Sequence, residues 1–224
     1  MFLAELLPAE QLQRIVLVDK CWPEVTAETA GAHQISWDHI HDGNWKVPLV
    51  TRKSNIKASR EVKQLQKYVF GPAEQHGPVI MLAVHLCGAL SCKAIAMFND
   101  NPIIKLMLLK PCCLPSKQML RSRRHPVEWS FPGYFFTATD VHKAISSEDM
   151  EWLPPQPTTR GVGSLNRKFS RWVKHLERAI DSSGDGVCKQ TEKILVQPNY
   201  FQNEFIFAGR HCATHPDGGD APEC

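Results

Sequence analysis

Two short clusters of histidine, lysine and cysteine side chains are the parts of this chain best suited to chemistry. Each cluster directly follows an apolar run, the first over residues 79–84 and the second over residues 104–109. The clusters read His85-Leu86-Cys87-Gly88 and Lys110-Pro111-Cys112-Cys113. Such apolar runs are typical of buried parallel strands, and functional groups gather at the carboxyl ends of these strands. We therefore expect the two clusters to lie side by side at one edge of a sheet.

The cysteines allow several interpretations from residue type alone. Packing at a strand–helix junction is the plainest, and a tight turn explains Gly88. A cysteine nucleophile would need a neighbouring group, Lys110 or His85, to lower its pKa. A four-ligand zinc site is conceivable, but adjacent strand residues point to opposite faces, so Cys112 and Cys113 could not readily share one ion. We therefore predict no metal site.

Composition is that of an ordinary globular protein. The chain has 224 residues, 43% of them hydrophobic and 22% charged, and its net charge of +3 argues neither for nor against nucleic acid. No apolar run approaches the roughly 18 residues that span a bilayer, and residues 1–7 lack the basic start of a signal peptide. The eight cysteines include no CxxC pair, which favours reduced thiols. We expect an intracellular protein, cytoplasmic or nuclear, with no membrane partner.

The elements that would position the clusters alternate between strand and helix. Apolar and β-branched runs predict strands over residues 15–18, 47–51, 79–85, 104–109, 193–197 and 204–208. Helical spacing predicts helices over residues 2–14, 24–34, 59–70, 89–98 and 165–180. The apolar side of the last helix consists of Leu165, Phe169, Trp172, Val173, Leu176 and Ile180. Alternation of this kind implies an α/β fold with a mostly parallel sheet, closed here by an antiparallel hairpin of the last two strands.

We expect one domain over residues 1–210. Residues 116–163 are basic, then aromatic and proline-punctuated, and we interpret them as an insertion or lid. Residues 211–224 are polar and rich in glycine and proline, which predicts a flexible tail.

The motif pair at residues 85–88 and 110–113, in this order of elements, resembles Rossmann-like S-adenosylmethionine-dependent methyltransferases, in particular a group that includes tRNA 2′-O-methyltransferases. The resemblance runs from about Ile15 to Gly209. It implies a single methyltransferase-like domain with S-adenosylmethionine as its cofactor. The family's first strand and Gly-rich turn have no counterpart before Ile15, so the resemblance implies an N-terminally incomplete sheet and weak or absent cofactor binding in this chain.

Roles for individual residues follow from the resemblance. It implies that Asp19 accepts hydrogen bonds from the cofactor ribose and that Asn55 lies near the adenine, where the family usually has aspartate. It places His85, Leu86 and Gly88 against the cofactor, and it makes His85 and Cys87 the catalytic pair. The residues implied to contact the substrate are Lys110, Cys112, Cys113, Arg121, Arg123 and Arg124.

The function expected on these grounds is methyl transfer to RNA. The arginines at 121–124 and the rings at 129–136 support RNA, because single strands are held by cations and stacking rings together. Two alternatives stay open. One is a noncatalytic scaffold of methyltransferase fold that binds RNA or protein. The other is a thiol- or zinc-dependent protein that uses the cysteine clusters.

Overall fold

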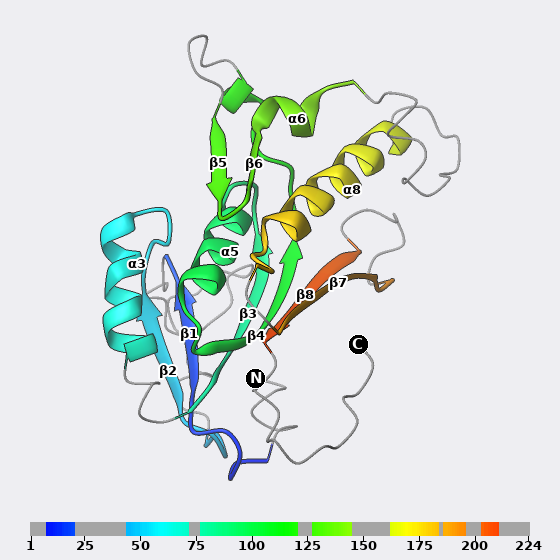
Figure 1. The fold of residues 1–224 in the computed structure, drawn as a ribbon. Coiled ribbons are helices and arrows are strands. Elements are labelled where there is room, and N and C mark those ends of the chain that lie inside the picture. Colours follow the sequence, from blue (N-terminus) through cyan, green and yellow to red (C-terminus); the bar gives the residue numbers. More distant parts are fainter. Residues whose placement is uncertain are drawn as a thin grey trace, which may run out of the picture. The chain divides into compact units, whose positions relative to one another are not determined.

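The computed structural model describes residues 8–20, 44–71, 77–120, 127–144, 162–183, 186–195 and 203–210 (Figure 1). By its contacts the chain divides into two compact units, Met1–Gly77 and Pro78–Cys224. The prediction of one domain over residues 1–210 stays a prediction. The predicted helix at 24–34, the predicted tail at 211–224 and the three arginines at 121, 123 and 124 lie outside the described residues.

The first unit contains a short parallel sheet and a helix. Strand β1 (Ile15–Asp19) pairs with β2 (Leu49–Lys53) in register, so that the first residues of the two strands are partners and the last residues are too. Helix α3 (Ser59–Leu65) continues into a π-helical turn, η1 (Gln66–Phe70), and together they match the helix predicted over 59–70. The helix predicted over 2–14 is wrong for residues 8–14, which form a turn after Pro8 and then an irregular segment.

The second unit is built on a four-stranded sheet of order β3-β4-β8-β7. Strands β3 (Val79–Leu86) and β4 (Ile104–Pro111) are parallel neighbours, as the sequence predicts. Strands β8 (Glu204–Arg210) and β7 (Val187–Lys193) complete the sheet, and the β4–β8 and β8–β7 pairs are both antiparallel. The strand predicted over 193–197 is wrong for residues 194–195, because the paired strand is the largely polar segment that ends at Lys193. Residues 196–197 lie outside the described residues.

The prediction of a mostly parallel Rossmann-like sheet is wrong for the residues that the structure describes. They form one four-stranded mixed sheet and two separate two-stranded sheets, with four α-helices. Parallel pairing needs a crossover connection, and here only β1–β2 and β3–β4 are paired in that way. The aromatic segment after residue 127 does not add to the main sheet. It folds on itself as β5 (Glu128–Phe131) and β6 (Tyr134–Thr137), around a turn at Gly133.

The core of the second unit lies between the sheet and two helices. Helix α5 (Leu90–Asp100) packs on β3 and β4, and helix α8 (Val162–Ala179) packs on β7, β8 and α5 (Figure 1). The predicted apolar side of α8 is confirmed by burial of Phe169, Trp172, Val173 and Leu176, and Ile180 just beyond the helix is buried too. Leu165 is exposed, so the predicted apolar side begins one turn too early.

Burial differs between the two parallel strands that the sequence treats alike. Ile104, Met107 and Leu109 of β4 are fully buried, as expected for a central strand. Ile80, Leu82 and Val84 alternate along β3, so they share one face, and all three are exposed. The difference follows from the face of the sheet and not from the strand. Ile80 pairs with Leu106 of β4, which is exposed too, whereas Met107 and Leu109 pair with Met81 and Ala83 on the opposite face.

A hairpin and a short helix also pack against α8. After the 3₁₀ turn η2 (Lys117–Leu120) and the β5–β6 hairpin, helix α6 (Ala138–His142) begins with a capping box between Thr137 and Asp140. The hairpin rings stack on one another and on α8, with the centroids of Phe136 and Trp172 5.7 Å apart in a T-shaped contact. The rings at 129–136, which the sequence analysis predicts to support RNA binding, are thus largely used in packing, although Phe135 is exposed.

Candidate functional site

Strand β3 ends in a bulge at His85. The pairing passes from Val84 with Lys110 to Leu86 with Pro111, so the register skips His85. Its φ of 59° is the only positive φ of a non-glycine residue in the described part of the chain. Such a conformation costs an L residue roughly 1–2 kcal/mol, and bulges commonly re-aim a side chain at the rim of a sheet. The imidazole is exposed at the carboxyl end of β3, where the sequence predicts a functional group.

The loop after β3 touches the loop after β4 at Gly88. The Gly88 amide donates a hydrogen bond to the Cys113 carbonyl over 3.2 Å. Gly88 has a φ of 52°, and a Cβ there would lie 3.2 Å from Pro115 Cα. Glycine is therefore required by the turn and by the close approach of the other loop. Its predicted contact with a cofactor stays a prediction.

We expect Gly88→Ala to lower the free energy of unfolding by about 1.5 kcal/mol, measured by urea denaturation followed by circular dichroism. The cost combines an unfavourable φ with pressure on the Pro115 backbone. Gly133→Ala is the matched control, because Gly133 also has a positive φ of 69° but open space where the Cβ would lie. It should cost about 1 kcal/mol, the cost of the positive φ alone. Equal effects of the two substitutions would show that the contact with Pro115 contributes nothing.

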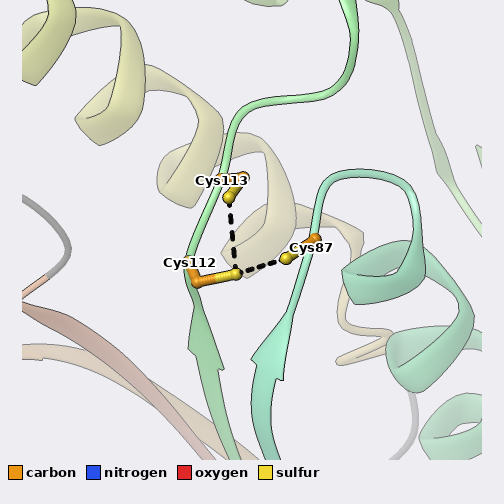
Figure 2. A group of neighbouring side chains, drawn as sticks. All are labelled: Cys87, Cys112 and Cys113. Carbon is orange, nitrogen blue, oxygen red and sulfur yellow. Dashed lines mark hydrogen bonds between the residues drawn. The ribbon is translucent and has the colours of Figure 1, made fainter. Parts of the chain in front are cut away.

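Three thiols meet beside His85 and Gly88. Cys87 follows β3, Cys112 and Cys113 follow β4, and their sulfur atoms all lie within 4.8 Å of one another. The Cys112 sulfur is 2.7 Å from the Cys87 sulfur and 3.6 Å from the Cys113 sulfur. Figure 2 shows the side chains of Cys87 and Cys113 both directed at the Cys112 sulfur. Cys112 is buried, whereas Cys87 and Cys113 are exposed.

The expectation that Cys112 and Cys113 point to opposite faces is wrong. That expectation assumes a continuous strand, but β4 ends at Pro111 and both cysteines belong to the following loop. The strict alternation of side chains no longer applies there, and the two sulfur atoms come within 3.6 Å. The sequence holds the signal for this convergence in Pro111 and Pro115, which flank the pair and disfavour an extended strand.

Electrostatics argue against a cysteine nucleophile at this edge. Burial raises the pKa of the Cys112 thiol, and the neighbouring thiols of Cys87 and Cys113 raise it further. Burial also raises the pKa of Cys113. A nucleophilic cysteine needs the opposite shift, because the thiolate is the reactive form. Cys112 and Cys113 are therefore poorly suited to nucleophilic catalysis.

Lys110 is buried at the end of β4, unlike the exposed Cys113 of the same motif. Its side chain is buried, and its Nζ lies 5.7 Å from the ring centroid of Phe205 on β8, a cation–π geometry. The contact ties the end of β4 to the neighbouring antiparallel strand. The substrate contact predicted for Lys110 stays a prediction.

In the first unit the structure brings Asp19 and Asn55 to one end of the β1–β2 pair. Asp19 is the last residue of β1, and its carbonyl accepts a hydrogen bond of 2.8 Å from the Ser54 amide just beyond β2. The Asn55 side-chain oxygen accepts from the Lys57 amide over 3.2 Å, and the Asn55 amide donates to the Glu61 carboxylate. Asn55 thus shapes the turn into α3, a local role that the sequence analysis missed although an Asx turn before a helix is a common pattern.

Comparison with known proteins identifies no relative. No family model matches the chain, and neither the curated proteins nor the solved structures yield a match. None of the helices in the described part of the chain is long and apolar enough to cross a membrane.

Proposed function

We propose that this chain takes part in S-adenosylmethionine-dependent methyl transfer, with the carboxyl ends of β3 and β4 as the edge where the reaction occurs. The observation that carries the proposal is the bulge at His85 beside the second motif. Strain held at an exposed histidine, at the end of a parallel strand, is typical of a residue positioned for function. The proposal rests on the two motifs and this edge, and not on the class of the sheet.

The residues at this edge suit a transfer reaction that depends on alignment. S-adenosylmethionine would supply an electrophilic methyl group. The two loops are fixed to each other through Gly88 and Cys113, which favours a rigid platform for holding an acceptor in line. With a hydroxyl acceptor, a nitrogen of the exposed His85 imidazole would take up the proton. Cys87, two residues on, would contact the acceptor and not form a covalent bond to it.

We propose RNA as the acceptor, and a basic surface of the first unit supports this. Arg60, Lys63 and Lys67 are exposed on α3 and η1, where they line one open hollow together with Tyr68. The Lys67 Nζ lies 5.0 Å from the centroid of the exposed Tyr68 ring. Cations beside an exposed ring are typical of surfaces that bind single-stranded RNA.

The test is a titration of the whole chain with S-adenosylmethionine, followed by ligand-observed NMR, with adenosine as the control ligand. We expect saturable but weak binding, with a Kd on the order of 0.1–1 mM. His85→Gly is the matched variant, because glycine accepts the positive φ and only the imidazole is lost. It should weaken binding about fivefold or more while the fold is kept.

Absence of saturable binding in the unaltered chain would contradict the proposal and favour a noncatalytic scaffold. Equal binding by the His85→Gly variant would remove His85 from the site. In a second arm, the titration is repeated with single-stranded RNA at two salt concentrations. RNA binding that weakens steeply with salt is expected from phosphate contacts, and its absence would exclude RNA as the acceptor.

A further inference from the structure

Two of the three clustered thiols are exposed, which is unusual for cysteine. Free cysteine is among the most buried residue types, and Cys92 on α5 shows the ordinary case, a thiol packed inside an apolar helix face. Cys87 and Cys113 are exposed instead, and both converge on Cys112. Packing therefore explains Cys92 but not this cluster.

The loops that carry the three thiols are held in place on both sides. The Gly88 amide donates to the Cys113 carbonyl over 3.2 Å, and the Ser91 hydroxyl donates to the Leu86 carbonyl over 2.8 Å. On the other side, His142 Nε2 of α6 lies 2.8 Å from the Pro115 carbonyl oxygen. Outer contacts of this kind fix ligand orientation in metal sites, so the three sulfur atoms are positioned before any ion binds.

We propose that Cys87, Cys112 and Cys113 together bind one thiophilic metal ion with a filled d shell, Zn²⁺ or Cu⁺. Sulfur ligands select ions of this class. Zn–S bonds of about 2.3 Å require sulfur atoms about 3.8 Å apart around a tetrahedral ion. The cluster, with separations from 2.7 Å to at most 4.8 Å, reaches this arrangement by a small outward rotation of the exposed Cys87 side chain.

Binding involves no change of oxidation state. Each thiol gives its proton to water as its sulfur forms a bond to the ion, so three protons leave for each ion bound. Three sulfur ligands leave a fourth position for water or a small ligand when the ion is Zn²⁺. No histidine or carboxylate of the described residues joins the three sulfur atoms in the cluster. The metal site shares Cys87 with the edge proposed for methyl transfer, but metal binding does not require that reaction, and its test is independent of cofactor binding.

The test uses the whole chain, reduced and free of metal, titrated with Co²⁺ as a spectroscopic substitute for Zn²⁺. We expect a thiolate-to-cobalt charge-transfer band that saturates at one equivalent and disappears when Zn²⁺ is added. A parallel titration with Cu⁺ against a chromophoric chelator distinguishes the two ions by their relative affinities. Failure of both Co²⁺ and Cu⁺ to bind at one equivalent would overturn the proposal.

Three cysteine variants test which thiols bind the metal. Cys87→Ser and Cys113→Ser alter exposed residues and should fold normally, which circular dichroism checks. Each should weaken metal binding on the order of 100-fold or more, because even outer contacts of metal sites are worth 10- to 100-fold. Cys188→Ser on β7 is the matched control and should bind the metal unchanged. A band that survives in the first two variants would place the metal elsewhere and overturn the proposal.

Discussion

Replacement of Trp172 by alanine is expected to lower the free energy of unfolding by about 4 kcal/mol, the largest effect of any substitution that we predict. Trp172 is fully buried on α8. Its ring lies 5.7 Å from the ring centroids of both Phe136 and Trp129, so it joins the β5–β6 hairpin to the helix. Alanine would leave a large cavity and also remove both aromatic contacts. Urea denaturation followed by circular dichroism measures the loss.

Trp172→Phe is the matched control for this prediction. The indole Nε1 is buried and has no hydrogen-bond partner within the described residues, so phenylalanine loses ring volume but no hydrogen bond. We expect it to cost about 1–2 kcal/mol, because the T-shaped contact can be kept and the cavity is smaller. If Trp172→Ala cost no more than Trp172→Phe, the hairpin would not depend on this ring for its attachment to α8.

The elements that sequence patterns identify well are those whose burial repeats along the chain. The helix over 165–180 is one case, because Phe169, Trp172 and Leu176 recur at helical spacing and all face the core. The parallel pair β3–β4 is another, because both runs are strongly apolar and a helix long enough for a crossover lies between them.

The parts that sequence patterns missed depend on partners far away in the chain. Strand β7 is largely polar, so its side-chain pattern does not predict a strand. Its place in the sheet comes from pairing with β8. The sequence of the aromatic segment over 128–137 suggests a loop or lid, but its rings pack on α8. Phe136, for example, contacts Trp172, which lies 36 residues further along the chain. Whether a strand joins one sheet or forms its own is likewise decided by these distant contacts, which explains the error in fold class.

Some features of the candidate site could be predicted from the sequence, and others could not. The meeting of the two motifs follows from parallel pairing and could be predicted. The bulge at His85 and the convergence of Cys112 with Cys113 could not, because both arise where the regular pairing of β3 and β4 ends. Rules for side-chain direction hold within a strand and fail at its last residue, which is where functional groups commonly lie.

His175 on α8 packs against the β5–β6 hairpin. Its ring stacks on Phe136 with centroids 4.8 Å apart, and its Nδ1 lies 2.6 Å from the Tyr134 hydroxyl. Burial lowers the pKa of His175 to about 4, and the nearby Asp140 carboxylate only partly opposes this shift. The cations that act in the same direction as burial are Arg178, Lys143 and Arg171.

Because this pKa is lower in the folded state than the ordinary value of 6.5, the unfolded chain binds more protons between pH 6.5 and pH 4. Stability from neutral His175 is therefore present above pH 6.5 and lost as the pH falls toward 4. We expect a loss of about 2 kcal/mol between pH 7 and pH 4.5, reduced from the full value because the side chain is only partly buried. His175→Gln keeps an acceptor for Tyr134 but cannot be protonated. Over the same pH range, the free energy of unfolding of this variant should therefore fall by about 2 kcal/mol less than that of the unaltered protein. Urea denaturation of both proteins across this range measures the difference, and parallel curves would show that His175 is not the group responsible.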